Sequence, residues 1–189
     1  MAVRRMPDDA PEEFLAAVRR LRAVRLRPEV VLEEVPAPQR IAPHAMALSA
    51  DAVADDEELA TGRFVLLHDP AAPPAWEGTF RVVSFVRAVL EPELGADPML
   101  GQVGWSWLED ALDAAGVAAT AVGGTVTRVV SESYGALADK PPSVELEVRA
   151  SWTPLDDLAE HLTAWSVLLC TVGGLPPLPD GVAPLARRR

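Results

Sequence analysis

The residues best suited to chemistry are few in this sequence, and the clearest pair is His68-Asp69, which follows the apolar stretch RFVLL. An imidazole next to a carboxylate can act as a general base with its orienting acid. Such a pair needs a nucleophile or a bound substrate at reach, and no recognisable nucleophile motif accompanies it. The alternative interpretation is structural: a strand that ends in a histidine and continues into an Asp-Pro turn.

Two arginines on an apolar strand are the second candidate. Arg81 and Arg87 lie on one face of the stretch TFRVVSFVRAVL. A buried guanidinium must be paired, and its partner can be the carboxylate or phosphate of a ligand or one of the many acids of the chain. Glu132, in the stretch SESY, adds a carboxylate between hydroxyls. It can bind a polar ligand or simply belong to a solvated sheet face.

The remaining reactive residue types point to structure. Cys170 follows Leu168 and Leu169 late in a predicted helix, where the helix dipole disfavours a thiolate, so we expect a small buried side chain. His161 lies beside an apolar helical stripe and is expected at the rim of the core. A single cysteine gives no metal-ligand spacing, and neither a phosphate-binding glycine loop nor a G-x-S-x-G or H-E-x-x-H motif occurs. No metal, cofactor or catalytic residue is therefore predicted.

Tryptophan is unusually frequent, and Trp76 and Trp105 are candidate contact residues. Five of the ten aromatic residues are tryptophan, a residue type enriched at the centres of protein interfaces. In the stretch GWSWLEDAL, Ser106 and Glu109 form a capping box. Asp97-Pro98 is a competing N-cap and N1 pair, but a helix from there would carry two glycines in its interior. The pattern therefore predicts a firm helix from about Ser106 to Ala115, with Trp105 just outside it. A buried Trp105 would be a structural clamp, whereas an exposed one would be the first place to look for a partner.

Composition narrows the class of protein. The chain has 189 residues and a formal net charge of −11, which argues against nucleic acid or an anionic membrane as the main partner. The N-terminal segment has no apolar stretch typical of a signal peptide. No run of about 18 uncharged apolar residues occurs either. A cytoplasmic protein is the expectation.

Periodicity predicts an α+β fold with one antiparallel sheet of about five to six strands packed with three helices. The helices are expected at about residues 11–27, 106–115 and 154–172, the last with Thr153 as its N-cap. Strands are expected in VVLEEV, HAMALSA, RFVLLH and TFRVVSFVRAVL, and in a hairpin of GGTVTRVVSESYG with SVELEVRASW. The predicted order is α-β-β-β-(β)-α-β-β-α. Residues 11–175 form the domain, between a flexible N-terminus (1–10) and a proline- and arginine-rich flexible tail (176–189).

Four stretches of the sequence carry a family resemblance. They are EEVPAPQRIAPHAMALSADA, WEGTFRVVSFVRAVLEPELGADPMLGQVGWSWLEDAL, GTVTRVVSESYG and VELEVRASWTP. With them the chain resembles the domain of unknown function 3000 family of high-GC Gram-positive bacteria. The resemblance covers nearly the whole chain, implies no established activity and assigns no catalytic residue. The predicted element order is also similar to that of type III secretion chaperones, small dimeric proteins that bind segments of a partner.

Two functions are compatible with these features of the sequence. The first is a non-enzymatic, chaperone-like binding or adaptor module that recognises a protein partner, with Trp76 and Trp105 on its surface and with possible self-association as a homodimer. The second is a binder of a small anionic molecule, or an enzyme, with a pocket between sheet and helices. That pocket would use His68, Asp69, Arg81, Arg87 and Glu132. The absence of a catalytic motif favours the first.

Overall fold

Antiparallel strands and three helices account for most of the chain. The computed structural model describes residues 10–177. Its elements are α1 (Glu12–Ala23), β1 (Val30–Val35), β2 (His44–Ala54), β3 (Glu57–His68), β4 (Phe80–Leu90), the 3-10 turn η1 (Pro92–Ala96), α2 (Leu100–Ala114), β5 (Ala119–Ser131), the 3-10 turn η2 (Gly135–Leu137), β6 (Ser143–Pro154) and α3 (Leu158–Val172).

One six-stranded sheet holds all the strands, in the order β1-β2-β3-β4-β6-β5. Every neighbouring pair is antiparallel. This architecture confirms the predicted α+β class and the predicted order of elements. β4 lies between β3 and β6, as its two largely apolar faces predicted.

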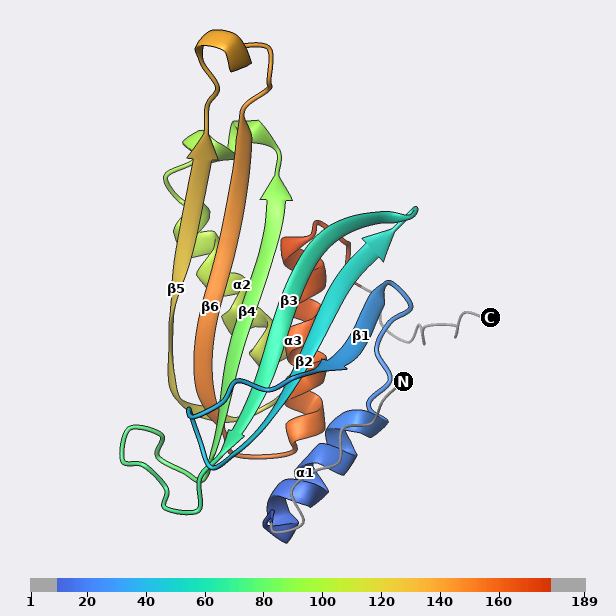
Figure 1. Cartoon of the computed structure of the whole chain (residues 1–189), viewed down its shortest axis with the longest axis vertical. Coiled ribbons are helices and arrows are strands. Elements are labelled where there is room, and N and C mark those ends of the chain that lie inside the picture. The colour runs from blue at the N-terminus through green and yellow to red at the C-terminus, as the bar shows by residue number, and fades with distance from the viewer. Residues whose placement is uncertain (1–9, 178–189) are drawn as a thin grey trace.

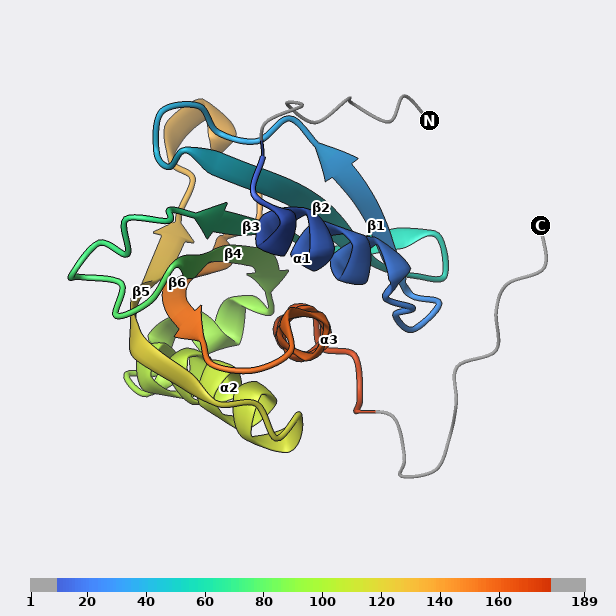
Figure 2. The same ribbon diagram turned by 90° about the horizontal axis from the view of Figure 1, so that it is seen from below.

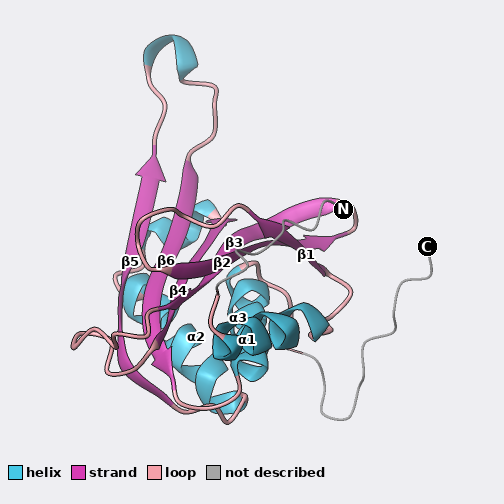
Figure 3. Ribbon diagram, turned by 60° about the horizontal axis from the view of Figure 1, so that its bottom comes forward, coloured by secondary structure: helices cyan, strands magenta, loops and turns pink. Residues whose placement is uncertain are grey.

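The three helices lie on the same side of the sheet. In Figure 1, α2 and α3 lie behind the strands, and the view from below shows α1, α2 and α3 together on one side of the bent sheet (Figure 2). Figure 3 shows the same segregation, with the β5–β6 hairpin extending beyond the body of the molecule. Within residues 10–177, the opposite face of the sheet carries no helix. We call it the open face.

The core lies between the sheet and α3. Strand residues of even number between 80 and 90 and between 144 and 152 point to the helices, and most of them are buried. The largest fully buried side chains include Trp152, Trp165 and Phe64. The Trp165 ring meets the Phe64 ring edge-on at 5.7 Å. Trp165 also lies over Gly62, because a Cβ atom there would come within 2.7 Å of its ring.

The start of α2 differs from the prediction. The helix begins at Leu100, six residues before the predicted Ser106, and Asp97 accepts a hydrogen bond from the Met99 amide at 2.8 Å. Ser106 is inside the helix and donates to the Val103 carbonyl, so the capping box does not form. The helix tolerates Gly104 because it crosses the sheet closely there, with Val126 and Leu146 against the glycine. Packing thus outweighs the cost of an internal glycine.

The start of α3 was also predicted wrongly. Thr153 and Pro154 are the last residues of β6, and the N-cap is Asp157, whose side chain accepts a hydrogen bond from the Ala159 amide. Thr153 is held in the sheet by its hydroxyl, which donates to the Trp76 carbonyl. A threonine-proline pair that resembles a helix start therefore closes the strand instead.

His161 is buried in the core rather than at its rim. Its Nδ1 accepts a hydrogen bond from the Trp152 indole at 3.1 Å, and its Nε2 lies 2.8 Å from Asp156. Burial lowers the pKa of His161, and the Asp156 carboxylate opposes this shift without cancelling it. The folded protein therefore holds this imidazole neutral to a lower pH than the unfolded chain does.

This burial predicts a pH-dependent stability. As the pH falls below about 6.5, the ordinary histidine pKa, the unfolded chain takes up a proton that folded His161 refuses, so the free energy of unfolding decreases. The substitution His161→Gln keeps an acceptor for Trp152 and removes the titration. Urea unfolding between pH 7 and pH 5 should show a shallower loss of stability in the variant than in the wild type. Equal slopes would contradict this assignment.

The flexible N-terminus predicted for residues 1–10 and the tail predicted for residues 176–189 lie almost entirely outside the described residues. Within residues 10–177 no helix has the length and apolar character needed to cross a membrane.

Candidate functional site

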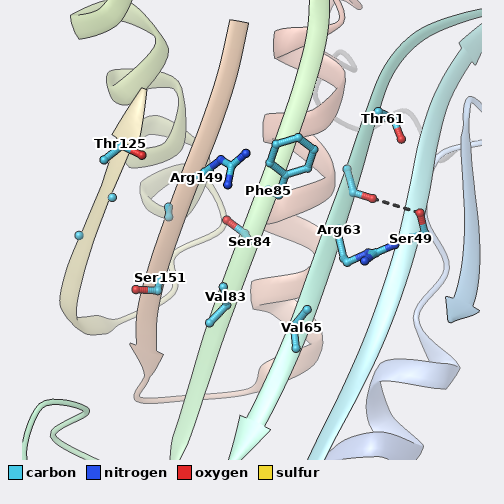
Figure 4. Close-up of a pocket in the computed structure, with 14 residues that line it drawn as sticks. Ser49, Thr61, Arg63, Val65, Val83, Ser84, Phe85, Thr125, Arg149 and Ser151 are labelled. Atoms are coloured by element: carbon cyan, nitrogen blue, oxygen red, sulfur yellow. Dashed lines mark hydrogen bonds between the residues drawn. The ribbon is translucent and has the colours of Figure 1, made fainter. Parts of the chain in front are cut away.

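The middle of the open face carries the candidate site. Strand register places Ser49, Arg63, Phe85, Arg149 and Thr125 in one row across β2, β3, β4, β6 and β5. Directly opposite residues on antiparallel strands have side chains within contact distance. Arg63 and Arg149 thus occupy the positions on either side of Phe85 at the centre of the sheet. The Arg149 guanidinium lies beside the Phe85 ring, whereas the Arg63 side chain extends toward Ser49 (Figure 4).

One end of the open face is covered by two connections. Ala47, Val65 and Leu67 are buried there. They lie beneath apolar residues of the β1–β2 connection and beneath Trp76 of the β3–β4 connection. Trp76, a predicted contact residue, is thus half-buried as part of this cover. The two connections therefore form one wall of the site, and the row that contains Arg63, Phe85 and Arg149 is not covered by them.

A trough of about 670 Å³ lies along the uncovered part of the face. Valines 65 and 83 form an apolar floor, and the hydroxyls of Ser49, Thr61, Thr125 and Ser151 surround it (Figure 4). Ser49 donates to the carbonyl of Gly62 at 3.3 Å. The trough is open to solvent along the face rather than enclosed between sheet and helices, where the pocket was predicted.

Among the described residues that line the trough, Arg63 carries a charge without a partner, whereas Arg149 is already paired with a carboxylate. Arg149 forms an exposed ion pair with Glu147 at 3.0 Å, and its guanidinium carbon lies 5.2 Å from the centre of the Phe85 ring. That distance is within the range of a cation–π contact. Within the described part of the chain, Arg63 has neither a hydrogen-bond partner nor a carboxylate within ion-pair distance. It is exposed, so its charge is available to a ligand.

The two predicted arginines are held by the protein itself. Arg87 forms a 2.6 Å ion pair with Glu145, and that hydrogen bond raises the pKa of Arg87. Arg81 donates to the hydroxyls of Ser151 and Thr153 at 2.7 and 3.3 Å. Burial lowers the pKa of Arg81. Both lie on the open face, as the strand pattern predicted, but they fasten strands together beside the trough.

His68 and Asp69 do not face each other. The His68 ring is fully buried on the helix side, where its Nε2 lies 2.7 Å from the Glu13 carboxylate of α1. It also lies opposite His44 on β2, with 5.8 Å between the ring centres. Asp69 accepts a hydrogen bond from the Ala71 amide at 2.9 Å and so stabilises the turn. The pair therefore holds α1 and a turn rather than forming an acid–base dyad.

Trp105 and Glu132 lie away from the trough. The Trp105 indole donates to Glu109 one turn later, at 2.9 Å, and its ring packs against Gly124 of β5 from the helix side. It is half-buried and acts as a clamp between α2 and β5. Glu132 accepts a hydrogen bond from the Tyr134 hydroxyl at 3.0 Å on the exposed hairpin.

The groups that could hold a metal or act as a nucleophile are scattered. In residues 10–177 no group of three or more histidine, cysteine, aspartate or glutamate side chains could hold a metal ion. Cys170 is buried, and burial raises the pKa of its thiol to about 11. Its packing in α3 matches the prediction of a small buried side chain.

The arrangement is suited to binding an anion next to an apolar group. Guanidinium groups pair with carboxylates or phosphates, and the valine floor and Phe85 can contact an apolar neighbour of that anion. Sequence reasoning missed Arg63 and Arg149 because the register that joins β3, β4 and β6 is not visible in one strand. A signal was present: both lie at outward positions of alternating strands.

A comparison with models of protein families identifies the family of this chain. The model of the family described as Protein of unknown function (DUF3000) matches residues 10–183. The chain belongs to the DUF3000 family. The match confirms the family resemblance read from the sequence, and it contains every residue of the trough. A search of curated proteins and a search of solved structures each returned no match for this DUF3000 protein.

Proposed function

We propose that this protein is a non-enzymatic binding module that takes an acidic segment of a partner protein in the trough of its open face. The observation that supports this most directly is Arg63, which is exposed, has no partner in the described chain and lies opposite Phe85 in the strand register. Arginine and aromatic side chains are enriched where protein interfaces concentrate their binding energy.

The shape of the trough favours a protein segment over a small molecule. Sites for small molecules are concave and bury most of the ligand surface. This trough is open to solvent, with side chains from β2, β3, β4, β6 and β5 along it. An extended segment can lie across several strands and place carboxylates on Arg63 and Arg149 while an apolar residue contacts Val83.

The test is a binding measurement with a defined peptide. A fluorescein-labelled peptide rich in aspartate, glutamate and leucine is titrated with the full chain, and its anisotropy is followed. Arg63→Ala and Arg149→Ala should each weaken binding by about tenfold, the effect of losing one hydrogen-bonded charge pair. Arg19→Ala, on the helix side of the molecule and paired with Glu12, is the matched control and should leave the affinity unchanged.

Two outcomes would overturn the proposal. One is equal binding of a peptide in which asparagine and glutamine replace the acids, because then charge plays no part. The other is the absence of peptide binding together with a rise in melting temperature in citrate or phosphate that Arg63→Ala abolishes. That second result would assign the trough to a small anion, the alternative function.

A further inference from the structure

The outer edge of β5 is the second unusual surface of the molecule. β5 is the last strand of the sheet, and within the described residues no strand pairs with its outer side. It runs for 13 residues and contains one charged residue, Arg128. A long edge strand with few charges presents free backbone amides and carbonyls to any strand that can pair with them.

β1 forms the opposite edge of the sheet, and its sequence protects it against pairing with a further strand. β1 has only six residues, and two of them are Glu33 and Glu34. Glu34 is bound by Arg22 of α1 through two hydrogen bonds of 2.9 Å. Pro36 follows the strand directly. Shortness, charge and proline all disfavour edge pairing. From Gly123 onward β5 has no proline, and Arg128 is its one charged residue.

Exposed apolar side chains gather around β5. The segments concerned are β5 itself, the hairpin that follows it, and η1 with the start of α2. They carry Val122, Val129, Val130, Tyr134, Leu137, Leu94, Met99 and Val103, each more than a third exposed. η1 lies next to the strand, because a Cβ atom on Gly95 would be 3.4 Å from Val130. Exposed apolar clusters of this kind mark surfaces that another protein covers.

We infer that two copies of this chain associate through their β5 edges, antiparallel and about a twofold axis. Two identical edges in antiparallel order are complementary to each other, and a twofold axis places the same patch on both sides. Pairing would satisfy the free backbone groups and cover the valines of both copies at once. The product is one continuous twelve-stranded sheet with both open faces on the same side.

The net charge of the protein affects how strongly two copies associate. Each copy has a net charge of −11, so the two bodies repel each other even though β5 itself is slightly basic. Added salt screens this repulsion and should strengthen the dimer. Arg63 lies on β3, away from the edge of β5. Arg63→Ala therefore tests the peptide site and Val129→Lys tests the dimer, so the failure of one proposal is distinguishable from the failure of the other.

The experiment is sedimentation of the full chain over a range of concentrations. At about 10 µM and near-physiological salt the wild type should sediment as a dimer. Val129→Lys places a charge on the open face of β5 and should weaken the dimer at least about tenfold, because a lysine on an edge strand opposes pairing. Val31→Lys makes the same change on β1 and should leave the dimer intact. Both valines are exposed, so both variants are expected to fold.

Hydrogen exchange gives an independent measurement of the same contact. Amides of residues 122–131 should become more protected as the protein concentration rises, and those of residues 30–35 should not. A strict monomer at every concentration would overturn the inference. A dimer that Val129→Lys leaves unchanged, or that Val31→Lys disrupts, would overturn it as well.

Discussion

Trp165→Ala should lower the free energy of unfolding by about 3–5 kcal/mol, the range for removing a large aromatic side chain from a core. Trp165 is fully buried, contacts the Phe64 ring and, together with Leu169, fills the space above Gly62. Whole domains are stable by only about 5–15 kcal/mol, so the variant should lose a large share of its stability. Urea unfolding followed by far-UV circular dichroism measures the difference.

Trp105→Ala is the matched control for this substitution. Trp105 is half-buried at the edge of the sheet, and its indole already contacts Glu109 near solvent. Its removal should cost clearly less than that of Trp165. Equal losses in the two variants would contradict the assignment of the core to α3 and the centre of the sheet.

Reversing both charges of the trough should abolish binding of the acidic peptide. In Arg63→Glu/Arg149→Glu, two attractive contacts become repulsive, and each reversal should cost at least as much as losing a charged hydrogen bond, so the affinity should fall by about 100-fold or more. The difference in affinity between the wild type and the double variant should become smaller as salt is added, because salt screens the charges of the trough. In the double variant any residual binding should be insensitive to salt or increase with it.

A control variant separates the effect of net charge on peptide affinity from the effect of direct contacts at the trough. Arg19→Glu/Arg20→Glu changes the total charge of the protein by the same amount, but both residues lie on α1, on the helix side. Peptide affinity should change by no more than about threefold in this control, because charges more than a Debye length away are largely screened. A similar loss in both double variants would show that the peptide senses only the overall charge.

The fold could be predicted from the sequence wherever the periodicity reports burial. β4 and β6 alternate so regularly that their faces, and the position of β4 inside the sheet, follow from the side chains alone. Helix starts could not be predicted in the same way. Ser106 and Thr153 both have the chemistry of an N-cap, but the packing of Gly104 on Leu146 and the bond from Thr153 to Trp76 decide the outcome.

The candidate site could be predicted only in part. The sequence indicates that Arg81 and Arg87 lie among apolar residues. It cannot show that Arg81 donates a hydrogen bond to Ser151 and that Arg87 forms an ion pair with Glu145, because both partners are far away in the sequence. Arg63 and Arg149 are 86 residues apart in the chain. They lie on either side of Phe85 only because of the register of β3, β4 and β6.

The position of two arginines at the centre of a strongly acidic body has a consequence for the speed of encounter. A partner that is negative over its whole surface meets repulsion at a distance and attraction only on contact, so its collisions are rarely productive and its association rate constant is low. A partner that carries a short acidic segment on a neutral or basic body is not repelled during its approach. Under the proposed function, the field around this protein would therefore select partners by their overall charge before Arg63 and Arg149 come within reach of a carboxylate.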